Sequence, residues 1–183
     1  MRLALAALLL LAPAVASARP ITVGASYGMI QSKADSGSDP NSQLTAFGRV
    51  GLGSSLETGL ELQDISAGDN STVIRTISGL LLVELGHGRL MPMLLGGVGI
   101  DHSATSYGST TDAHHFEAGF ALEYRADSGL VLGGDLRIGD RSIDSNSNMV
   151  YPLSGGVAYR APATSQLSDG EYRSARLYVG VRF

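Results

Sequence analysis

The sequence contains no cysteine and no tryptophan, and its only lysine is Lys33. The lack of cysteine excludes disulfide bonds, thiol chemistry and processing as a lipoprotein. After residue 18 no apolar run reaches the roughly eighteen residues that a membrane-spanning helix needs. The net charge of −4 comes without a basic stripe, so the sequence gives no sign of nucleic-acid binding.

The first eighteen residues have the pattern of a secretory signal peptide. Arg2 forms a short basic head, an apolar run covers 3–15, and small residues follow at 16–18 for cleavage. The apolar run is too short for a retained spanning helix, which needs about twenty residues. We therefore expect residues 1–18 to be removed on export and residues 19–183 to form one domain.

Segments of about ten residues with period-two alternation recur along the mature chain, as membrane barrels require. In 116–125 one face is apolar throughout, whereas the other carries Glu117, Glu123 and Arg125. The same alternation predicts strands over 21–30, 44–53, 56–65, 72–85, 90–101, 115–125, 130–140 and 173–183.

The connections between these segments alternate in length. Short joints at 53–55, 86–89 and 126–129 alternate with long polar stretches at 31–43, 66–71, 102–114 and 141–172. This asymmetry is typical of outer-membrane barrels, in which short turns lie on the periplasmic side. The predicted fold is therefore all-β: a closed antiparallel up-and-down transmembrane β-barrel of eight strands. Residues 149–160 also alternate, so ten strands is the competing count; we place them in the fourth long loop as a β-extension.

Three segments carry motifs in addition to the alternation: 92–99, 118–125 and 178–183. With them the chain resembles the small outer-membrane β-barrel family, the eight-stranded type of the OmpA transmembrane domain and OmpX. The resemblance implies the bacterial outer membrane, reached through the periplasm, and outer-membrane lipid as a partner. It also implies insertion by the barrel-assembly machinery, which reads the last strand at Tyr178, Val179, Val181 and Phe183. It implies no shared activity.

The ionic face of the strands is predicted to line the lumen. Glycines on that face leave room for long charged side chains, and the balanced signs suit buried ion pairs. The predicted lumen network consists of Arg49, Glu57, Glu61, Glu84, Glu117, Glu123, Arg125, Asp135, Arg137, Arg176 and Arg182. A soluble, lipocalin-like barrel would instead place the apolar face inside.

No motif for catalysis, for a cofactor or for a metal is present: glycine-rich 96–99 does not open a helix, and no nucleophile elbow or Walker pattern occurs. Three alternatives stay open: an acid–base pair at Glu57/Glu61 or Glu117/Glu123, a rim metal site of His102 with His114 or His115, and a hydrolase site from Asp101, His102, Ser103 and His114. We expect none of them, and no cofactor.

The sequence therefore predicts a monomeric outer-membrane barrel with a largely filled lumen and a structural or surface-interaction role, not an enzyme. Its loops are rich in Ser, Asp and Asn, which suits a hydrated surface and names no extracellular ligand. The alternatives are a narrow channel for small solutes, an outer-membrane enzyme and a soluble periplasmic barrel.

Overall fold

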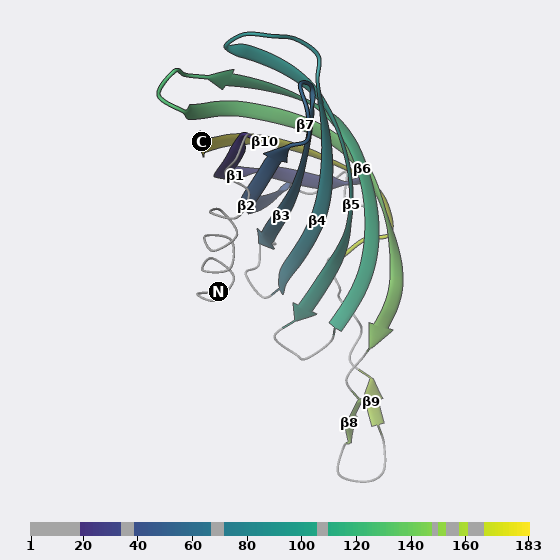
Figure 1. The fold of residues 1–183 in the computed structure, drawn as a ribbon. Helices are drawn as coiled ribbons and strands as arrows, with labels where there is room; N and C mark the ends of the chain where they lie inside the picture. Colours follow the sequence, from purple (N-terminus) through teal and green to yellow (C-terminus); the bar gives the residue numbers. More distant parts are fainter. Residues whose placement is uncertain are drawn as a thin grey trace.

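Eight strands close into one antiparallel barrel in the order β1-β10-β7-β6-β5-β4-β3-β2 (Figure 1). The computed structural model describes residues 19–33, 39–66, 72–105, 110–147, 150–152, 158–160 and 167–183. The barrel strands are β1 (Ile21–Ser32), β2 (Asn41–Gly51), β3 (Leu56–Ser66), β4 (Thr72–Glu84), β5 (Leu90–Thr105), β6 (Thr110–Arg125), β7 (Leu130–Ser147) and β10 (Gly170–Arg182). Within the described part of the chain, no helix is both long enough and apolar enough to cross a membrane.

The first and last strands close the cylinder. β1 pairs with β10 from Thr22↔Arg182 to Ser32↔Tyr172. Beyond this ladder, the Phe183 amide donates to the Ile21 carbonyl at 2.9 Å, and the Ile21 amide donates to the Phe183 carbonyl at 3.2 Å. Closure matters because an open strand edge would leave backbone polar groups without partners in hydrocarbon.

The two ends of the barrel differ in part as predicted. Short turns at 52–55, 85–89 and 126–129 join strands at one end, which we call the turn end. Gly129 enables the last turn, because its φ is 86° and a Cβ there would lie 2.6 Å from the Arg182 carbonyl oxygen. At the opposite end, the loop end, the connections 33–40 and 148–169 are longer, whereas 67–71 and 106–109 are no longer than the longest turn. The loop end is the outer side in barrels of this kind.

Six strands extend by two or more residues further toward the loop end than the alternation predicts. β1 continues to Ser32 and β2 begins at Asn41. β5 continues to Thr105, β6 begins at Thr110, β7 continues to Ser147 and β10 begins at Gly170. The prediction of loops over these parts of 31–43, 102–114 and 141–172 is therefore wrong. The ladder simply continues, for example at His102↔Asp112, but with polar side chains on the outward face, so the apolar signal ends before the strand does.

The competing count of ten spanning strands is excluded by the topology. β8 (Val150–Pro152) and β9 (Ala158–Arg160) form a two-stranded sheet of their own. Figure 1 shows them beyond the loop end of β5, β6 and β7, as the predicted β-extension of the fourth loop. The remainder of predicted 149–160 lies outside the described residues. Residues 1–18 do so too, and their cleavage stays a prediction.

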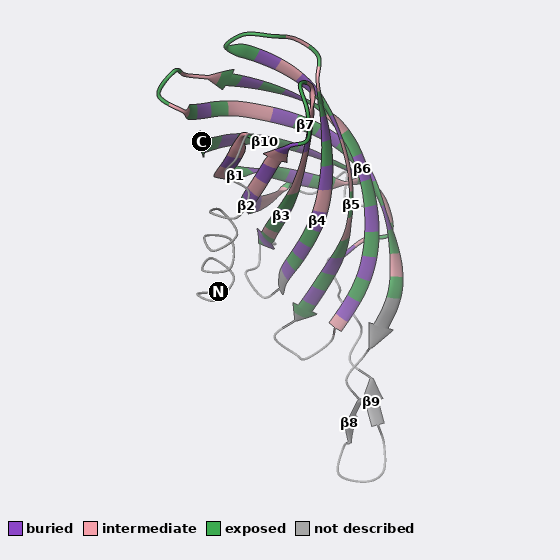
Figure 2. Ribbon diagram, viewed as in Figure 1, coloured by how far each residue is buried: buried purple, intermediate pink, exposed green. Residues whose placement is uncertain are grey.

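The apolar face of the barrel points outward and the ionic face inward. Leu136, Val98 and Leu177 are 65, 66 and 76 % exposed, whereas Glu123 is 0 % exposed. Figure 2 shows this alternation of exposed and buried residues along each strand. This orientation is opposite to that of a lipocalin-like soluble barrel, and it surrounds the cylinder with an apolar band.

The lumen is less uniformly ionic than the sequence pattern indicates. On the inner face of β4, β5 and β6 lies a buried apolar cluster of Leu80, Leu82, Met91, Met93, Leu95 and Ala121. The alternation could not reveal it because residues 80–83 are apolar on both faces of β4. This cluster fills one side of the lumen, and the ion pairs share the rest with two smaller apolar clusters, one of which contains Phe47, Val131 and Tyr178.

Candidate functional site: the ion-paired lumen

The charged side chains of the lumen form three clusters along the barrel axis. All eleven residues of the predicted network face the lumen: eight are buried, and Glu84, Arg125 and Arg182 have side chains that are at most 20 % exposed. Asp101, His115 and Arg141 join them. The described part of the lumen thus holds seven carboxylates and six guanidinium groups, with His115 in addition.

The turn-end cluster is centred on Glu123, which is buried completely. Its carboxylate accepts from Arg49 at 2.6 Å and from Arg125 Nε at 2.6 Å. Arg125 also donates to Glu84 at 2.6 Å, so one guanidinium bridges two acids. The six members are Arg49, Glu57, Glu84, Glu123, Arg125 and Arg182. Equal numbers of each sign make this cluster neutral.

The central cluster carries one negative charge more than it has guanidinium groups. Arg176 donates to Glu61 at 2.8 and 3.0 Å and to Asp135 at 2.8 Å. Arg137 donates to the same Glu61 at 2.9 Å and to Asp135 at 3.0 Å. It also donates to Glu117, the fifth member. Bidentate Arg–carboxylate pairs have fixed geometry, so this cluster ties β3, β6, β7 and β10 together across the lumen.

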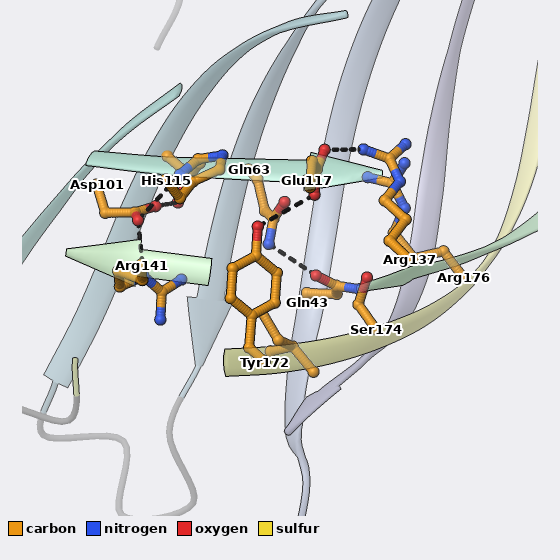
Figure 3. Close-up of a pocket in the computed structure, with 12 residues that line it drawn as sticks. Gln43, Gln63, Asp101, His115, Glu117, Arg137, Arg141, Tyr172, Ser174 and Arg176 are labelled. Carbon is orange, nitrogen blue, oxygen red and sulfur yellow. Dashed lines mark hydrogen bonds and ion pairs between the residues drawn. The ribbon is translucent and has the colours of Figure 1, made fainter. Parts of the chain in front are cut away.

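The loop-end cluster is built around Asp101, whose carboxylate accepts three hydrogen bonds (Figure 3). The donors are Thr76 at 2.5 Å, His115 Nδ1 at 3.0 Å and Arg141 Nε at 2.7 Å. The Arg141 guanidinium also lies 4.9 Å from the centre of the Tyr172 ring. Since Tyr172 donates to Glu117 at 3.2 Å, it connects the loop-end cluster to the central one. Such complete pairing is what buried charges require.

Sequence analysis missed these three loop-end residues for identifiable reasons. Asp101 and His115 stand at the ends of the predicted strands 90–101 and 115–125, where polar residues indicate only the approach to a loop. Arg141 lies one residue beyond the predicted end of 130–140. The alternation itself could have revealed them, because all three residues stand at positions whose side chains point into the lumen.

The residues of the hydrolase alternative do not come together. Asp101 and Ser103 are buried in the lumen, whereas His102 and His114 are exposed on the outer face. His102 pairs with Asp112 at 2.6 Å and His114 with Asp144 at 2.7 Å. This correction follows from the alternation of side chains along β5 and β6, which separates neighbours onto opposite faces.

A different serine, histidine and aspartate do lie in line. His115 Nε2 is 3.2 Å from Ser78 Oγ, and its Nδ1 faces Asp101. Because a carboxylate only accepts, the proton between His115 and Asp101 sits on Nδ1, and in a neutral imidazole Nε2 then accepts from Ser78. Neither of the two cavities described below has Ser78 in its lining. The arrangement satisfies buried polar groups.

The described residues offer no cluster of three or more His, Asp or Glu side chains with the geometry of a metal site. In particular, His102, His114 and His115 each have a separate carboxylate partner. His115 faces the lumen while the other two face outward. The rim metal site of His102 with His115 is therefore not formed. The two glutamate pairs of the acid–base alternative are all engaged by arginines.

Glycine makes room for the arginine stems inside the barrel. A Cβ at Gly28 would lie 2.7 Å from the Cγ of Arg176, and one at Gly59 would lie 2.8 Å from the Cγ of Arg49. Real side chains essentially never approach so closely, so the positions of both guanidinium groups depend on these glycines. The interior of an eight-stranded barrel is just wide enough for its own side chains. In this barrel, glycines provide the space that the long arginine side chains need.

Two small cavities lie among the described residues of the lumen, one on each side of the central cluster. Each has a volume of about 10 Å³, the space of a single water molecule. Arg137 and Arg176 line both, so these two side chains separate them. The first cavity adjoins Asp101, His115 and Tyr172 at the loop end, as Figure 3 shows. We call it the loop-end cavity.

Comparison with solved structures agrees with this architecture. Neisserial surface protein A matches with a TM-score of 0.59 and 12 % identity, over 90 % of this chain and 95 % of that one. The N-terminal β-barrel domain of Pseudomonas aeruginosa OprF matches with a TM-score of 0.58 and 12 % identity, over 90 % and 97 %. A major outer membrane protein from Thermus thermophilus gives 0.58 and 15 %, over 91 % and 100 %.

The chain has the fold of the small outer-membrane β-barrels. No family model and no curated protein matches its sequence, so this likeness is one of fold. The sequence-based expectation of an eight-stranded barrel of the OmpA and OmpX kind is confirmed at that level. In such a barrel the exposed apolar band faces lipid tails and the lumen clusters lie at membrane depth.

Proposed function

We propose that the protein resides in the bacterial outer membrane as a monomeric barrel with a closed lumen, and that its role is structural or one of surface interaction. The observation that carries this proposal is the interlocked lumen. Three ion-pair clusters and three apolar clusters fill it, and the two cavities described among them hold about one water molecule each. A general porin needs a continuous aqueous path, for which these contacts leave no space.

Planar-bilayer recording tests the closed lumen directly. The purified protein is expected to insert without discrete current steps, while a general porin reconstituted in the same way confirms that the assay detects opening. Discrete openings of the purified protein would overturn the proposal. They would favour the second candidate, a narrow channel, for which the two cavities flanking Arg137 and Arg176 are the supporting observation.

Cell fractionation tests the location. The outward apolar band requires lipid, so the protein is expected in the outer-membrane fraction and in solution only with detergent. Recovery in the detergent-free soluble periplasm would reject both the membrane location and outer-membrane lipid as a partner. Size-exclusion chromatography with light scattering, corrected for the micelle, checks the monomer.

Assembly by the barrel-assembly machinery forms part of the same proposal. In β10 Val179 and Val181 lie on the outward face and Tyr178 points into the lumen, and Phe183 follows the strand on the outward face. Phe183 is 77 % exposed, so it contributes little packing to the folded barrel. An exposed aromatic at this position suits recognition during insertion better than stabilisation afterwards.

A further inference from the structure

The second cavity of the lumen lies between the central cluster and the turn-end cluster, and we call it the turn-side cavity. Its volume of about 10 Å³ is the space of one water molecule. Arg49 of the turn-end cluster lines it together with four charged members of the central cluster: Glu61, Asp135, Arg137 and Arg176. Part of the buried apolar cluster, including Leu80 and Leu82, completes the wall.

Two buried polar atoms in the wall of the turn-side cavity have no hydrogen-bond partner among the described residues. They are Oγ of Ser26, which is 3 % exposed, and Nε of Arg49, which is 6 % exposed. A buried donor without a partner loses its hydration and gains nothing in return, and the loss is greater for a charged group. The loop-end cavity differs in this respect, because none of the orphaned buried atoms found in the described part of the chain belongs to its lining.

Arg49 cannot turn its Nε toward another acceptor without losing contacts that hold it. Its Nη2 donates to Glu123 at 2.6 Å. The guanidinium carbon lies 4.8 Å from the centre of the Phe47 ring and 5.3 Å from that of Tyr178, so aromatic rings also fix the group. Because the guanidinium is a rigid plane, these contacts also set the direction of the Nε–H bond.

The chemistry of the wall decides what can occupy the turn-side cavity. The Nε–H of Arg49 can only donate, so the occupant must accept a hydrogen bond, which a metal ion or an ammonium ion cannot do. Glu61 and Asp135 also line the cavity, and they belong to the cluster with one carboxylate in excess, which disfavours an anion. A neutral molecule that both accepts and donates, and that fits about 10 Å³, is water.

We propose that the turn-side cavity is a binding site for one ordered water molecule, which accepts from Arg49 Nε and is hydrogen-bonded to Ser26 Oγ. The ion pairs of Arg49 are with Glu123 and Glu57, both in the turn-end cluster. The water therefore adds a polar link from this cluster toward the central one, as Tyr172 does from the loop end. The proposal concerns one site and not conduction, so it can fail while the closed lumen proposed above holds, and the reverse.

A crystal structure of the unaltered barrel, at a resolution that shows ordered solvent, tests the site directly. One water molecule is expected within hydrogen-bond distance, about 2.7–3.2 Å, of both Ser26 Oγ and Arg49 Nε. Crystals grown with bromide in place of chloride distinguish an anion from water, because bromide gives an anomalous signal. A dry cavity would overturn the proposal, and so would an ion in it.

Three variants of Ser26 test the site in solution, by urea titration in detergent micelles. Ser26→Val and Ser26→Thr add the same volume to the cavity, but only threonine keeps a hydroxyl that can accept from Arg49 in place of the water. The unfolding equilibrium constant of Ser26→Val is expected to be at least about tenfold larger than that of Ser26→Thr, because valine displaces the water and leaves Nε unpaired. Ser26→Ala leaves room for the water and is expected to have a smaller effect than valine.

Thr22→Val is the matched control for the loss of a hydroxyl. Thr22 lies on the inner face of the same strand and is buried, but it lines neither cavity, so its exchange is expected to have a clearly smaller effect. Equal or greater stability of Ser26→Val relative to Ser26→Thr would overturn the proposal, because an apolar side chain stabilises a dry cavity that it fills. An effect of Thr22→Val as large as the difference at 26 would contradict it as well.

Discussion

Gly133 of β7 lies directly opposite Tyr178 of β10, and a Cβ on this glycine would be 2.4 Å from the Cζ of the tyrosine ring. The ring therefore occupies the volume that a side chain at 133 would take. Tyr178 uses this place to donate to Glu123 at 3.2 Å and to pack edge-on against Phe47, with ring centres 5.7 Å apart. The absence of a side chain at 133 thus positions an aromatic ring against the turn-end cluster.

Replacing Gly133 by alanine is expected to lower the free energy of unfolding by about 1–3 kcal/mol, the usual cost of overpacking. Gly96→Ala is the matched control, because a Cβ there meets its nearest neighbour at an ordinary 3.9 Å. Urea titration in detergent micelles measures both. In a Tyr178→Ala background the cost of Gly133→Ala is expected to shrink, and an unchanged cost would show that the ring is not the cause.

Truncation of Glu123 to alanine is expected to cost about 3–5 kcal/mol, because Arg49 and Arg125 would keep their buried charges without this partner. Asp127→Ala is the control, since it removes an exposed ion pair with Arg89 at a turn, where such pairs contribute about 0–1 kcal/mol. The same urea titration compares them. Equal, small effects would mean that the lumen is hydrated well enough to screen its charges.

An arginine introduced on the outer face is expected to lower the free energy of unfolding more, the closer it lies to the middle of the apolar band. Leu136→Arg, on the outer face of β7, is predicted to destabilise the barrel in lipid by about 2–4 kcal/mol. Asp140→Arg, on the same face of the same strand but beyond the last apolar residue, Ile138, is predicted to cost about 0–1 kcal/mol. Unfolding in bilayer vesicles is the measurement. A reversed order would contradict the position of the band.

Phe183→Ala is expected to slow insertion by reconstituted barrel-assembly machinery while leaving the free energy of unfolding within about 0.5 kcal/mol of the parent. Phe116→Ala, which removes another exposed aromatic of the outer face, is the control and is expected to insert at the parent rate. Pulse insertion followed by protease protection gives the rates. Normal insertion of the Phe183 variant would refute the assembly role of the last residue.

The sequence predicted the spanning part of the fold because lipid imposes a strict code there. An outward residue such as Leu136 must be apolar, and its neighbour Arg137 must find partners inside, so the period of two is visible in the chain. This alternation of apolar and polar residues ends where the strand leaves the hydrocarbon layer. Beyond Ile138 the outward residues of β7 become polar, and the continuing strand then reads as a loop.

The partners within the lumen could not be predicted in the same way. Alternation places Arg137 and Glu61 inside, but their contact depends on the register of strands that are not adjacent. Ser78 gave no signal, since an isolated serine in an apolar strand suggests only a tolerated polar residue. Its place beside His115 follows from the shear of the closed barrel, which the local sequence does not encode.

The orientation of the two faces is tested most directly by depth-dependent fluorescence quenching. The chain has no tryptophan, so Leu122→Trp and Val179→Trp each introduce a single reporter on the outer face, and Leu82→Trp is a lumen control. In vesicles of lipids brominated along the acyl chain, the outer reporters are predicted to be strongly quenched and insensitive to aqueous iodide, and the lumen reporter to be weakly affected by either. Outer reporters that iodide quenches, or that neither agent reaches, would contradict an apolar exterior in contact with lipid.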